Sequence, residues 1–258
     1  MESALDYHTA KALLEWQVEF GVTETICDAP VNRFEAKPEP KKAPKPVEPA
    51  IKPGIAQKPA EVDGAVLARA AASGAGDLAA LKAAMSDFEA CELKRGARNL
   101  VFADGVAGAR VMIIGEAPNR DEDREGKLFI GDTGILLDKM LGAIGLSRAE
   151  NVYLTKALPW RLPRNQEPKP EDLAMMLPFL ERHVALAKPD FLILFGNIAC
   201  QAVLKKRGIT RLRGEWVEAM GVPALPMFHP SYLLNNPDKK REAWADLLSL
   251  KARLRENT

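Results

Sequence analysis

The sequence predicts an α/β domain built on a central parallel sheet of four strands flanked by helices. Short, continuous apolar runs recur along the C-terminal part of the chain, and helical patterns separate them. Apolar runs without alternation are typical of strands buried on both faces, as in a parallel sheet covered by helices. With 258 residues, the chain is long enough for one such domain and a smaller appendage.

The N-terminal part precedes this pattern and differs from it. In residues 2 to about 20, apolar side chains recur at near-helical spacing and predict a short amphipathic helix. Residues 36–60 contain KPEPKKAPKPVEPAIKPGIAQKPA, and such Pro- and Lys-rich sequence favours an extended tether. A second helix is expected from Ala65 to about Ala90. We therefore expect a helical segment at 1–35, a flexible linker at 36–63 and one domain at 64–258.

Four strands and four helices are predicted in the remainder of the domain. The strands are expected at Val111–Ile114, Val152–Leu154, Phe191–Phe195 and Ala224–Phe228. The helices are expected at about Thr133–Ile144, Pro170–Ala187, Asn197–Lys205 and Pro237–Arg255. In such sheets the ligand crevice lies beyond the carboxyl ends of the strands, so the loops that follow the strands are the places to look for function.

Composition bears on partners and on compartment. The 36 Lys+Arg and 35 Asp+Glu leave a net charge of +1, so nucleic-acid binding would need basic groups gathered locally. Cys27, Cys91 and Cys200 are widely spaced and form no CxxC pair, which argues against a disulfide framework or a zinc site. No signal sequence or long apolar span is evident. We expect a cytoplasmic monomer without membrane contact.

The loop after the first strand reads GEAPNRDED from Gly115 to Asp123. A tight turn with carboxylates close behind it could hold a water molecule for general-base attack. The alternative is a solvated acidic loop, since charged runs usually lie on the surface. Phe129, a few residues further on in GKLFIG, could be a stacking platform for a flat heterocycle or could simply pack in the core.

The loop after the last strand begins at His229 and reads HPSYLL. A histidine at a strand end can donate a hydrogen bond to a carbonyl oxygen that gains negative charge. The alternative is a structural histidine that caps the next helix. His8 and His183 fit a structural role better, because one lies near the terminus and the other within a predicted helix.

Four segments together resemble type-4 uracil-DNA glycosylases and their near relatives. They keep their order and spacing over about Cys91 to Arg255, and they read GEAPNRDED, GKLFIGDTGILLDKML, YLTKALPWRLPRNQEPKPEDL and HPSYLLNNPDKKREAW. The resemblance implies a uracil-DNA glycosylase-like fold and a base-excision repair hydrolase. Such an enzyme flips uracil, or a related deaminated base, out of DNA and hydrolyses its N-glycosidic bond. DNA containing uracil or abasic sites is the implied partner, and the N-terminal helix is a candidate for binding a protein partner.

The resemblance also implies roles for individual residues. Phe129 corresponds to the ring that stacks on the flipped base, and His229 to the group that stabilises the leaving base anion. Glu122, and less directly Glu116, correspond to the carboxylates near the water and the sugar. The base-binding and water-binding positions are Lys156, Gly115, Ala117, Pro118 and Asn119, and the expected DNA contacts are Ser231, Tyr232 and Arg161.

The chain departs from this family at the cofactor. The four cysteines that hold a [4Fe–4S] cluster in type-4 enzymes correspond here to Phe88, Cys91, Trp160 and Met176. One thiolate cannot hold a cluster that takes four. No cofactor is therefore expected, and the large apolar side chains are expected to pack in the cluster's place. Cys200 lies outside these positions and is expected to be buried as a small hydrophobic residue.

A second departure lies in the base pocket. Lys156 stands where the family usually has Asn, whose amide offers uracil both a donor and an acceptor, whereas lysine offers donors only. Lys156 could contact a phosphate, contact the base O4 alone, or, if desolvated, attack an abasic aldehyde. Alternatively, it is an exposed side chain swung out of a disused pocket. Asn119 also replaces the usual Gly of the first motif.

Three functions follow from these patterns. Phe129 and His229 favour an active, cluster-free glycosylase for uracil or a related deaminated base. Lys156 and Asn119 favour a non-catalytic module that binds single-stranded or abasic DNA. The N-terminal helix and linker favour an accessory protein that tethers a degenerate domain to a repair complex. Of the three, the active glycosylase is the preferred hypothesis.

Overall fold

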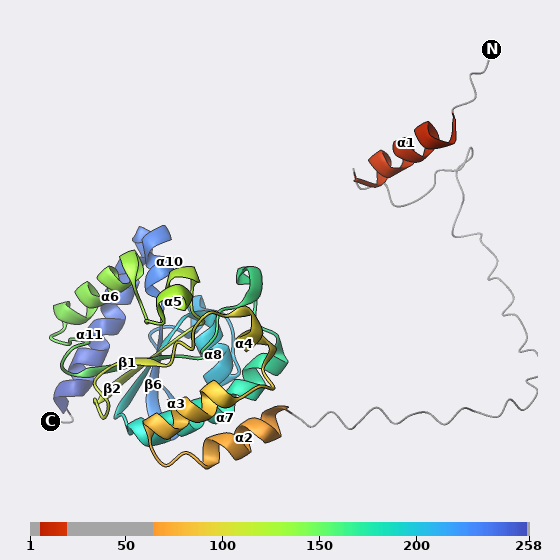
Figure 1. The fold of residues 1–258 in the computed structure, drawn as a ribbon. Coiled ribbons are helices and arrows are strands. Elements are labelled where there is room, and N and C mark those ends of the chain that lie inside the picture. The colour runs from red at the N-terminus through yellow and green to blue at the C-terminus, as the bar shows by residue number, and fades with distance from the viewer. Residues whose placement is uncertain (1–5, 20–63, 257–258) are drawn as a thin grey trace, which may run out of the picture. The chain divides into compact units, whose positions relative to one another are not determined.

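The computed structural model describes residues 6–19 and 64–256 (Figure 1). The first range contains one helix, α1 (Tyr7–Glu19), on which Leu13, Leu14 and Trp16 are exposed. The helix predicted near the N-terminus is therefore confirmed, with a later start. The expected linker at 36–63 and Cys27 lie outside the described residues.

A mixed sheet of six strands lies at the centre of the second range, in the order β1-β3-β2-β4-β6-β5. Its four inner strands run parallel, as predicted, and are β3 (Val152–Lys156), β2 (Val111–Gly115), β4 (Phe191–Phe195) and β6 (Val222–Met227). Two short antiparallel strands, β1 (Ala103–Gly105) and β5 (Val217–Ala219), close the edges. The expectation of four strands is therefore wrong, because these edge strands have three residues each and carry no apolar run.

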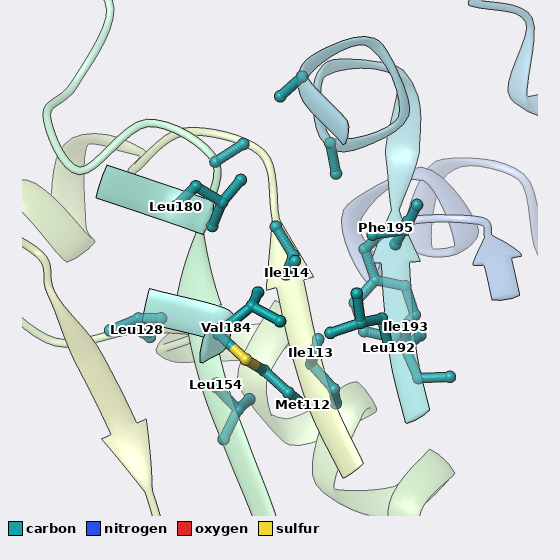
Figure 2. Packing of buried hydrophobic residues seen from close by; sticks show 14 of the residues in the cluster. Met112, Ile113, Ile114, Leu128, Leu154, Leu180, Val184, Leu192, Ile193 and Phe195 are labelled. Atoms are coloured by element: carbon teal, nitrogen blue, oxygen red, sulfur yellow. The ribbon is translucent and has the colours of Figure 1, made fainter. Parts of the chain in front are cut away.

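The core is formed where the inner strands meet the helices. Every residue of β2, β3 and β4 is buried, which explains why these strands read as continuous apolar runs rather than alternating ones. Figure 2 shows Ile113 of β2, Leu154 of β3 and Ile193 of β4 in one apolar cluster with Leu180 and Val184. This packing fixes the strand ends that carry the site.

Helices cover both faces of the sheet (Figure 1). On one side lie α6 (Gly131–Ala143) and α11 (Lys240–Glu256), and on the other lie α7 (Pro170–Ala187) and α8 (Gly196–Leu204). The helices α2 (Gly64–Ser73) and α3 (Leu78–Asp87) pack against α7. The connection from β2 runs through α6 to β3, whereas the connection from β4 runs through α8 to β6, in the opposite direction across the sheet. Because such crossovers are right-handed, α6 and α8 lie on opposite faces, and the direction changes between β2 and β4.

Two of the predicted helices are each divided into two elements in the structure. The single helix expected from Ala65 to about Ala90 is divided into α2 and α3, because Gly74 and Gly76 interrupt it and Asp77 starts a new helix. The Asp77 carboxylate accepts a hydrogen bond from the backbone N–H of Ala80 at 2.7 Å. The helix expected at Pro237–Arg255 begins as a 3-10 turn, η2 (Pro237–Lys239), and continues as α11.

Several short helices are not predicted by the sequence patterns, because elements of three to six residues show no helical period. Two of them start directly after inner strands or their turns and help to form the site. The short elements are α4 (Glu92–Gly96), α5 (Arg120–Glu125), η1 (Pro163–Asn165), α9 (Ile209–Leu212) and α10 (Pro230–Asn235). None of the helices in the two described ranges has the length and apolarity to span a bilayer.

His183 and Cys200 are buried, as the sequence indicates. His183 Nε2 lies 2.8 Å from the Tyr153 hydroxyl, and its ring stacks on Phe102 at a centroid distance of 4.5 Å. Desolvation lowers the pKa of His183 to about 4, so the imidazole is neutral at pH 7. His183 therefore has the structural role expected of it. Cys200 is a fully buried residue of α8.

Candidate active site

The loops that follow β2, β3, β4 and β6 meet at the carboxyl edge of the sheet, where ligands bind in open α/β folds. They line a cavity of about 320 Å³, formed by Glu116, Ala117, Pro118, Asn119, Glu122, Thr133, Lys156, Leu162, Gln166, Ile198, His229 and Ser231. A neighbouring cavity of about 310 Å³ shares Glu116, His229 and Ser231 with the first and extends to Tyr232 and Asn235.

Asn119 organises the first loop as the N-cap of α5. Its side-chain oxygen accepts hydrogen bonds from the backbone N–H groups of Asp121 and Glu122, both at 2.9 Å, and its own N–H donates to Glu122 Oε2 at 2.8 Å. This reciprocal arrangement is a capping box, and it turns Glu122 inward. The interpretation of the acidic loop as wholly solvated is therefore wrong: Asp121 is exposed, but Glu122 is buried.

Glu122 connects three parts of the site. Its Oε1 accepts a hydrogen bond from the N–H of Phe129 at 2.5 Å. The Nζ of Lys156 lies 2.9 Å from Oε1 and 3.1 Å from Oε2. With side chains only 1% and 2% exposed, Lys156 and Glu122 form a fully buried ion pair. Such a pair is tolerated only when further hydrogen bonds satisfy the charges, and here the N–H groups of Asn119 and Phe129 do so.

Phe129 has an unusual backbone conformation, with φ of 48° in the left-handed region that non-glycine residues seldom adopt. Hydrogen bonds on both sides hold it there. Its N–H donates to Glu122, and its carbonyl accepts from Arg148 Nη2 at 3.2 Å. Arg148 also donates to the Leu128 carbonyl at 2.9 Å and pairs with Asp104 at 3.0 Å. The position of the ring is therefore fixed by groups outside the motif that contains it.

The ring of Phe129 is buried and does not line the cavity. The Nζ of Lys156 lies 4.1 Å from its centroid, a cation–π contact, and the His229 ring lies 5.6 Å away at an interplanar angle of 27°. A Cβ on Gly115 would come within 2.8 Å of the Phe129 ring and 3.0 Å of Lys156, so a larger residue there would displace one of these side chains. Stacked rings have centroids about 4.5–7 Å apart, so the ammonium occupies space that a base stacked on that face would need.

Lys156 is therefore not the exposed side chain that one alternative proposes. The other interpretations remain: a contact to a phosphate, a contact to the base O4, or attack on an abasic aldehyde. The side chain ends β3, lines the cavity and is held by Glu122 and Phe129.

His229 has the capping role that the sequence offers as one of two alternatives, and its ring also faces the cavity. It is the N-cap of α10: its Nδ1 accepts from the backbone N–H of Ser231 at 3.2 Å and lies 2.7 Å from the Ser231 hydroxyl. Because Nδ1 accepts, the ring proton of the neutral form lies on Nε2. Desolvation, with a smaller contribution from the Lys156 charge, lowers the pKa of His229 to about 3. His229 is thus a neutral hydrogen-bond donor at pH 7, and it lines both cavities.

Glu116 joins the loop after β2 to the start of α8. Its Oε1 accepts from the backbone N–H of Ile198 at 3.1 Å. Burial raises the pKa of Glu116, while the hydrogen bond from Ile198 and the Lys156 charge act in the opposite direction. Gly196, at φ of 86°, allows this approach, because a Cβ there would lie 2.4 Å from the Glu116 carboxylate.

The remaining predicted site residues divide between the cavities and their surroundings. Ala117, Pro118, Asn119 and Ser231 line the first cavity. Tyr232 lines the second, with its ring stacked on Phe228 at 5.0 Å, whereas Arg161 lines neither. Sequence reasoning misses the other lining residues, which are Thr133, Leu162, Gln166, Gly196, Asn197, Ile198, Ile209, Phe228 and Asn235. Most of these residues follow a predicted strand. They could have been found by taking every residue of the loops beyond the carboxyl ends of the strands as a candidate.

The residues at the cluster positions do not fit a [4Fe–4S] cluster. Phe88, Cys91, Trp160 and Met176 are all buried and belong to the apolar core. Cys91 supplies the one thiol of the four, and burial raises its pKa, which disfavours the thiolate a metal would need. Among the described residues, no group of three or more His, Cys, Asp or Glu side chains is arranged to hold a metal ion.

Comparisons with known proteins match the part of the chain that carries this site. The family model of the uracil DNA glycosylase superfamily matches residues 102–248, from just before β1 into α11. The chain is 35% identical over 150 residues to a type-4 uracil-DNA glycosylase of Thermotoga maritima, over 57% of this chain and 78% of that protein. It is 34% identical over 165 residues to a type-4 uracil-DNA glycosylase of Archaeoglobus fulgidus, with 60% and 82% covered.

Proposed function

Because the chain belongs to the uracil-DNA glycosylase superfamily, we propose that it is a base-excision repair enzyme that hydrolyses the N-glycosidic bond of uracil, or a related deaminated base, in DNA. The observation that carries the proposal is His229, a neutral and oriented donor on the wall of a cavity at the carboxyl edge of the sheet. The two relatives of the chain named above are type-4 uracil-DNA glycosylases.

His229 acts on the leaving base. The target nucleotide is flipped out of the helix, at a cost of a few kcal/mol, so that its base enters the cavity. As the glycosidic bond breaks, negative charge develops on the base oxygens, and the Nε2–H of His229 donates a hydrogen bond to one of them. A donor already in place, in a site with little water, stabilises such charge more than a solvated one. The low pKa keeps His229 neutral, so it lowers the energy of the anion without first binding a proton.

Glu116 and Glu122 have different roles in this proposal. Both oxygens of Glu122 are engaged by protein groups, and Glu122 therefore organises the site. Glu116 lies at the first turn after β2 with a raised pKa, beside the loop that lines the cavity. We assign to Glu116 the positioning of the attacking water, together with the backbone of Ala117 and Pro118.

Lys156 and Phe129 set the base preference. Stacking on Phe129 requires the ammonium to move from the ring face, while its N–H groups remain able to donate to O4. Lys156 has no acceptor, so it cannot receive a hydrogen bond from the uracil N3–H. Uracil is therefore bound with one hydrogen bond fewer than an Asn would provide.

The remaining parts of the proposal concern cofactor and partners. The enzyme works without an iron–sulfur cluster, as the side chains at the cluster positions indicate. Ser231, Tyr232 and Arg161 contact the DNA, with Ser231 and Tyr232 along the second cavity. The segment 1–35, joined through 36–63, docks a protein partner through the exposed apolar side chains of α1.

Single-turnover excision of uracil from single- and double-stranded oligonucleotides tests the proposal. The wild type should excise uracil, and His229→Ala should slow the chemical step by about 10²–10³-fold, the usual cost of losing one positioned donor to a developing anion. His8→Ala, on the exposed face of α1, is the matched control and should leave the rate unchanged.

A second function is favoured by one observation, the cover that Lys156 forms over Phe129. If the wild type excises no uracil from either substrate but binds abasic or single-stranded DNA, the domain is a DNA-binding module. Equilibrium binding to oligonucleotides with and without an abasic site distinguishes this outcome.

A further inference from the structure

Lys156 has surroundings that differ from those of an ordinary lysine. Its ammonium is removed from water, lies 2.9 Å from a carboxylate oxygen and faces an aromatic ring at 4.1 Å. A lysine removed from water can attack a carbonyl carbon once a neighbouring base takes its proton, and the Glu122 carboxylate is such a base. The hydrolysis proposed above uses this amine only as a hydrogen-bond donor to the base, and not as a nucleophile.

We propose that the protein also cleaves abasic sites, with Lys156 as the nucleophile that forms a Schiff base with C1′ of the sugar. The inference rests on the proposed function, because base hydrolysis produces the abasic sugar in the same cavity. Lys156 lines that cavity together with Glu116, Asn119 and His229. Once the base has left, the space it filled is open to the ring-opened sugar, whose aldehyde can approach the floor of the cavity.

The first step forms the C=N bond. Glu122 takes one proton from the Lys156 ammonium, and the lone pair of the resulting amine bonds to C1′ while the carbonyl electrons move to the oxygen. A proton passes from nitrogen to that oxygen, which gives a carbinolamine. The hydroxyl then takes the proton held by Glu122 and leaves as water, and the nitrogen lone pair forms the iminium.

The second step breaks the strand. Glu122, again a carboxylate, removes a proton from C2′; the electron pair forms the C2′=C3′ bond, and the C3′–O bond breaks. The phosphate leaves with the electron pair of the C3′–O bond and becomes the 5′-phosphate of the downstream fragment. Water then hydrolyses the iminium, which frees Lys156 as the ammonium and leaves an unsaturated aldehyde on the upstream fragment, and Glu122 releases its proton to solvent.

Phe129 supports this chemistry through its ring face. The ring already lies under the ammonium, and it would stabilise the iminium cation by the same cation–π interaction. Glu122, with its carboxylate oxygens 2.9 and 3.1 Å from the nitrogen, is the proton carrier. An Asn at position 156 has no amine and could form no such intermediate.

Borohydride trapping on DNA that already contains an abasic site tests the inference. An oligonucleotide with one uracil is first treated with an unrelated uracil-DNA glycosylase, which is then removed, so that the substrate does not depend on excision by this protein. The full chain is incubated with this DNA and sodium borohydride, and the covalent product is separated on a denaturing gel. Mass spectrometry of its peptides should place the reduced sugar on Lys156.

Variants sharpen the assignment. Lys156→Gln and Lys156→Arg should lose both the trapped product and strand cleavage, and Glu122→Gln should slow them. The exposed Lys139→Gln is the matched control and should trap as the wild type does. Peptide mapping of the wild type decides the question even if the Lys156 variants unfold.

No trapped product with the wild type, or a product on another lysine or on the N-terminal amine, overturns the inference. The proposed glycosylase fails separately. A protein that excises uracil but traps no abasic DNA refutes the lyase alone, and one that traps abasic DNA without excising uracil refutes the glycosylase alone.

Discussion

Replacing Lys156 with Asn should destabilise the domain and at the same time improve uracil excision. The substitution removes the ammonium from a buried pair and leaves the Glu122 carboxylate in a site where its side chain is 2% exposed. Breaking a buried pair by removing one partner costs about 3–5 kcal/mol. Two backbone N–H groups, from Asn119 and Phe129, still donate to the carboxylate, so we expect the lower end, about 3 kcal/mol.

That loss of stability is measurable as a shift in Tm. For a domain of this size, 1 kcal/mol corresponds to about 2–4 °C, so Lys156→Asn should melt about 6–12 °C lower than the wild type. Excision should change in the opposite direction. Removal of the ammonium uncovers the Phe129 ring, and the amide can accept from the uracil N3–H, which adds one hydrogen bond of about 1–1.5 kcal/mol. The single-turnover rate should rise about tenfold.

Lys156→Met is the matched control, since it removes the charge and the donors without supplying an amide. It should melt lower to a similar extent but gain less in excision than Lys156→Asn. If Lys156→Asn melts within about 1 °C of the wild type, the ion pair is not a stabilising contact of the native state. If it excises uracil more slowly than the wild type, Lys156 takes part in excision, and the interpretation of Lys156 as an obstacle to uracil is wrong.

Three further outcomes follow from other contacts. Arg148→Ala removes the hydrogen bonds that hold the Leu128 and Phe129 carbonyls, so it should lower the free energy of unfolding by about 2–3 kcal/mol in urea titrations and slow excision, whereas exposed Arg241→Ala should do neither. His229 and His183 have depressed pKa values, so the unfolded chain binds protons that the native state does not as the pH falls below about 6.5. Each should cost about 2 kcal/mol of stability between pH 6.5 and 5, and a flat stability profile there would contradict their neutrality. The purified protein should lack stoichiometric iron and absorption near 400 nm, and chelators should leave its Tm unchanged; a brown protein whose colour follows its iron content would show that the residues at the cluster positions are not the ligands.

The sequence predicts the inner sheet and the long helices well, because buried strands show continuous apolar runs and buried helices show apolar residues at helical spacing. The strand at Phe191–Phe195 and the helix at Pro170–Ala187 have the predicted bounds. The edge strands β1 and β5 are held by backbone pairing with their neighbours, and their sequences ADG and VEA carry no apolar period. The short helix α5 depends on a capping box rather than on periodicity.

The candidate site is predictable in part for a related reason. Glu116 and His229 each follow an inner strand, so the topology alone brings them to one edge. The surroundings of Lys156 depend on Glu122, which is 34 positions earlier in the chain, and no local pattern shows that the two side chains meet. The same holds for Arg148, which lies outside every motif. It is in the loop that follows α6 and donates a hydrogen bond to the Phe129 carbonyl.

The capping box of α5 also makes site assembly visible at single amides. The N–H groups of Asn119 and Phe129, ten residues apart, donate to the two oxygens of the same carboxylate. Outward rotation of Glu122 would therefore expose both protons to deuterium in one opening event, and their exchange would share a rate. A ligand that holds Glu122 in place would slow both together, which makes this pair of amides an intrinsic reporter of occupancy.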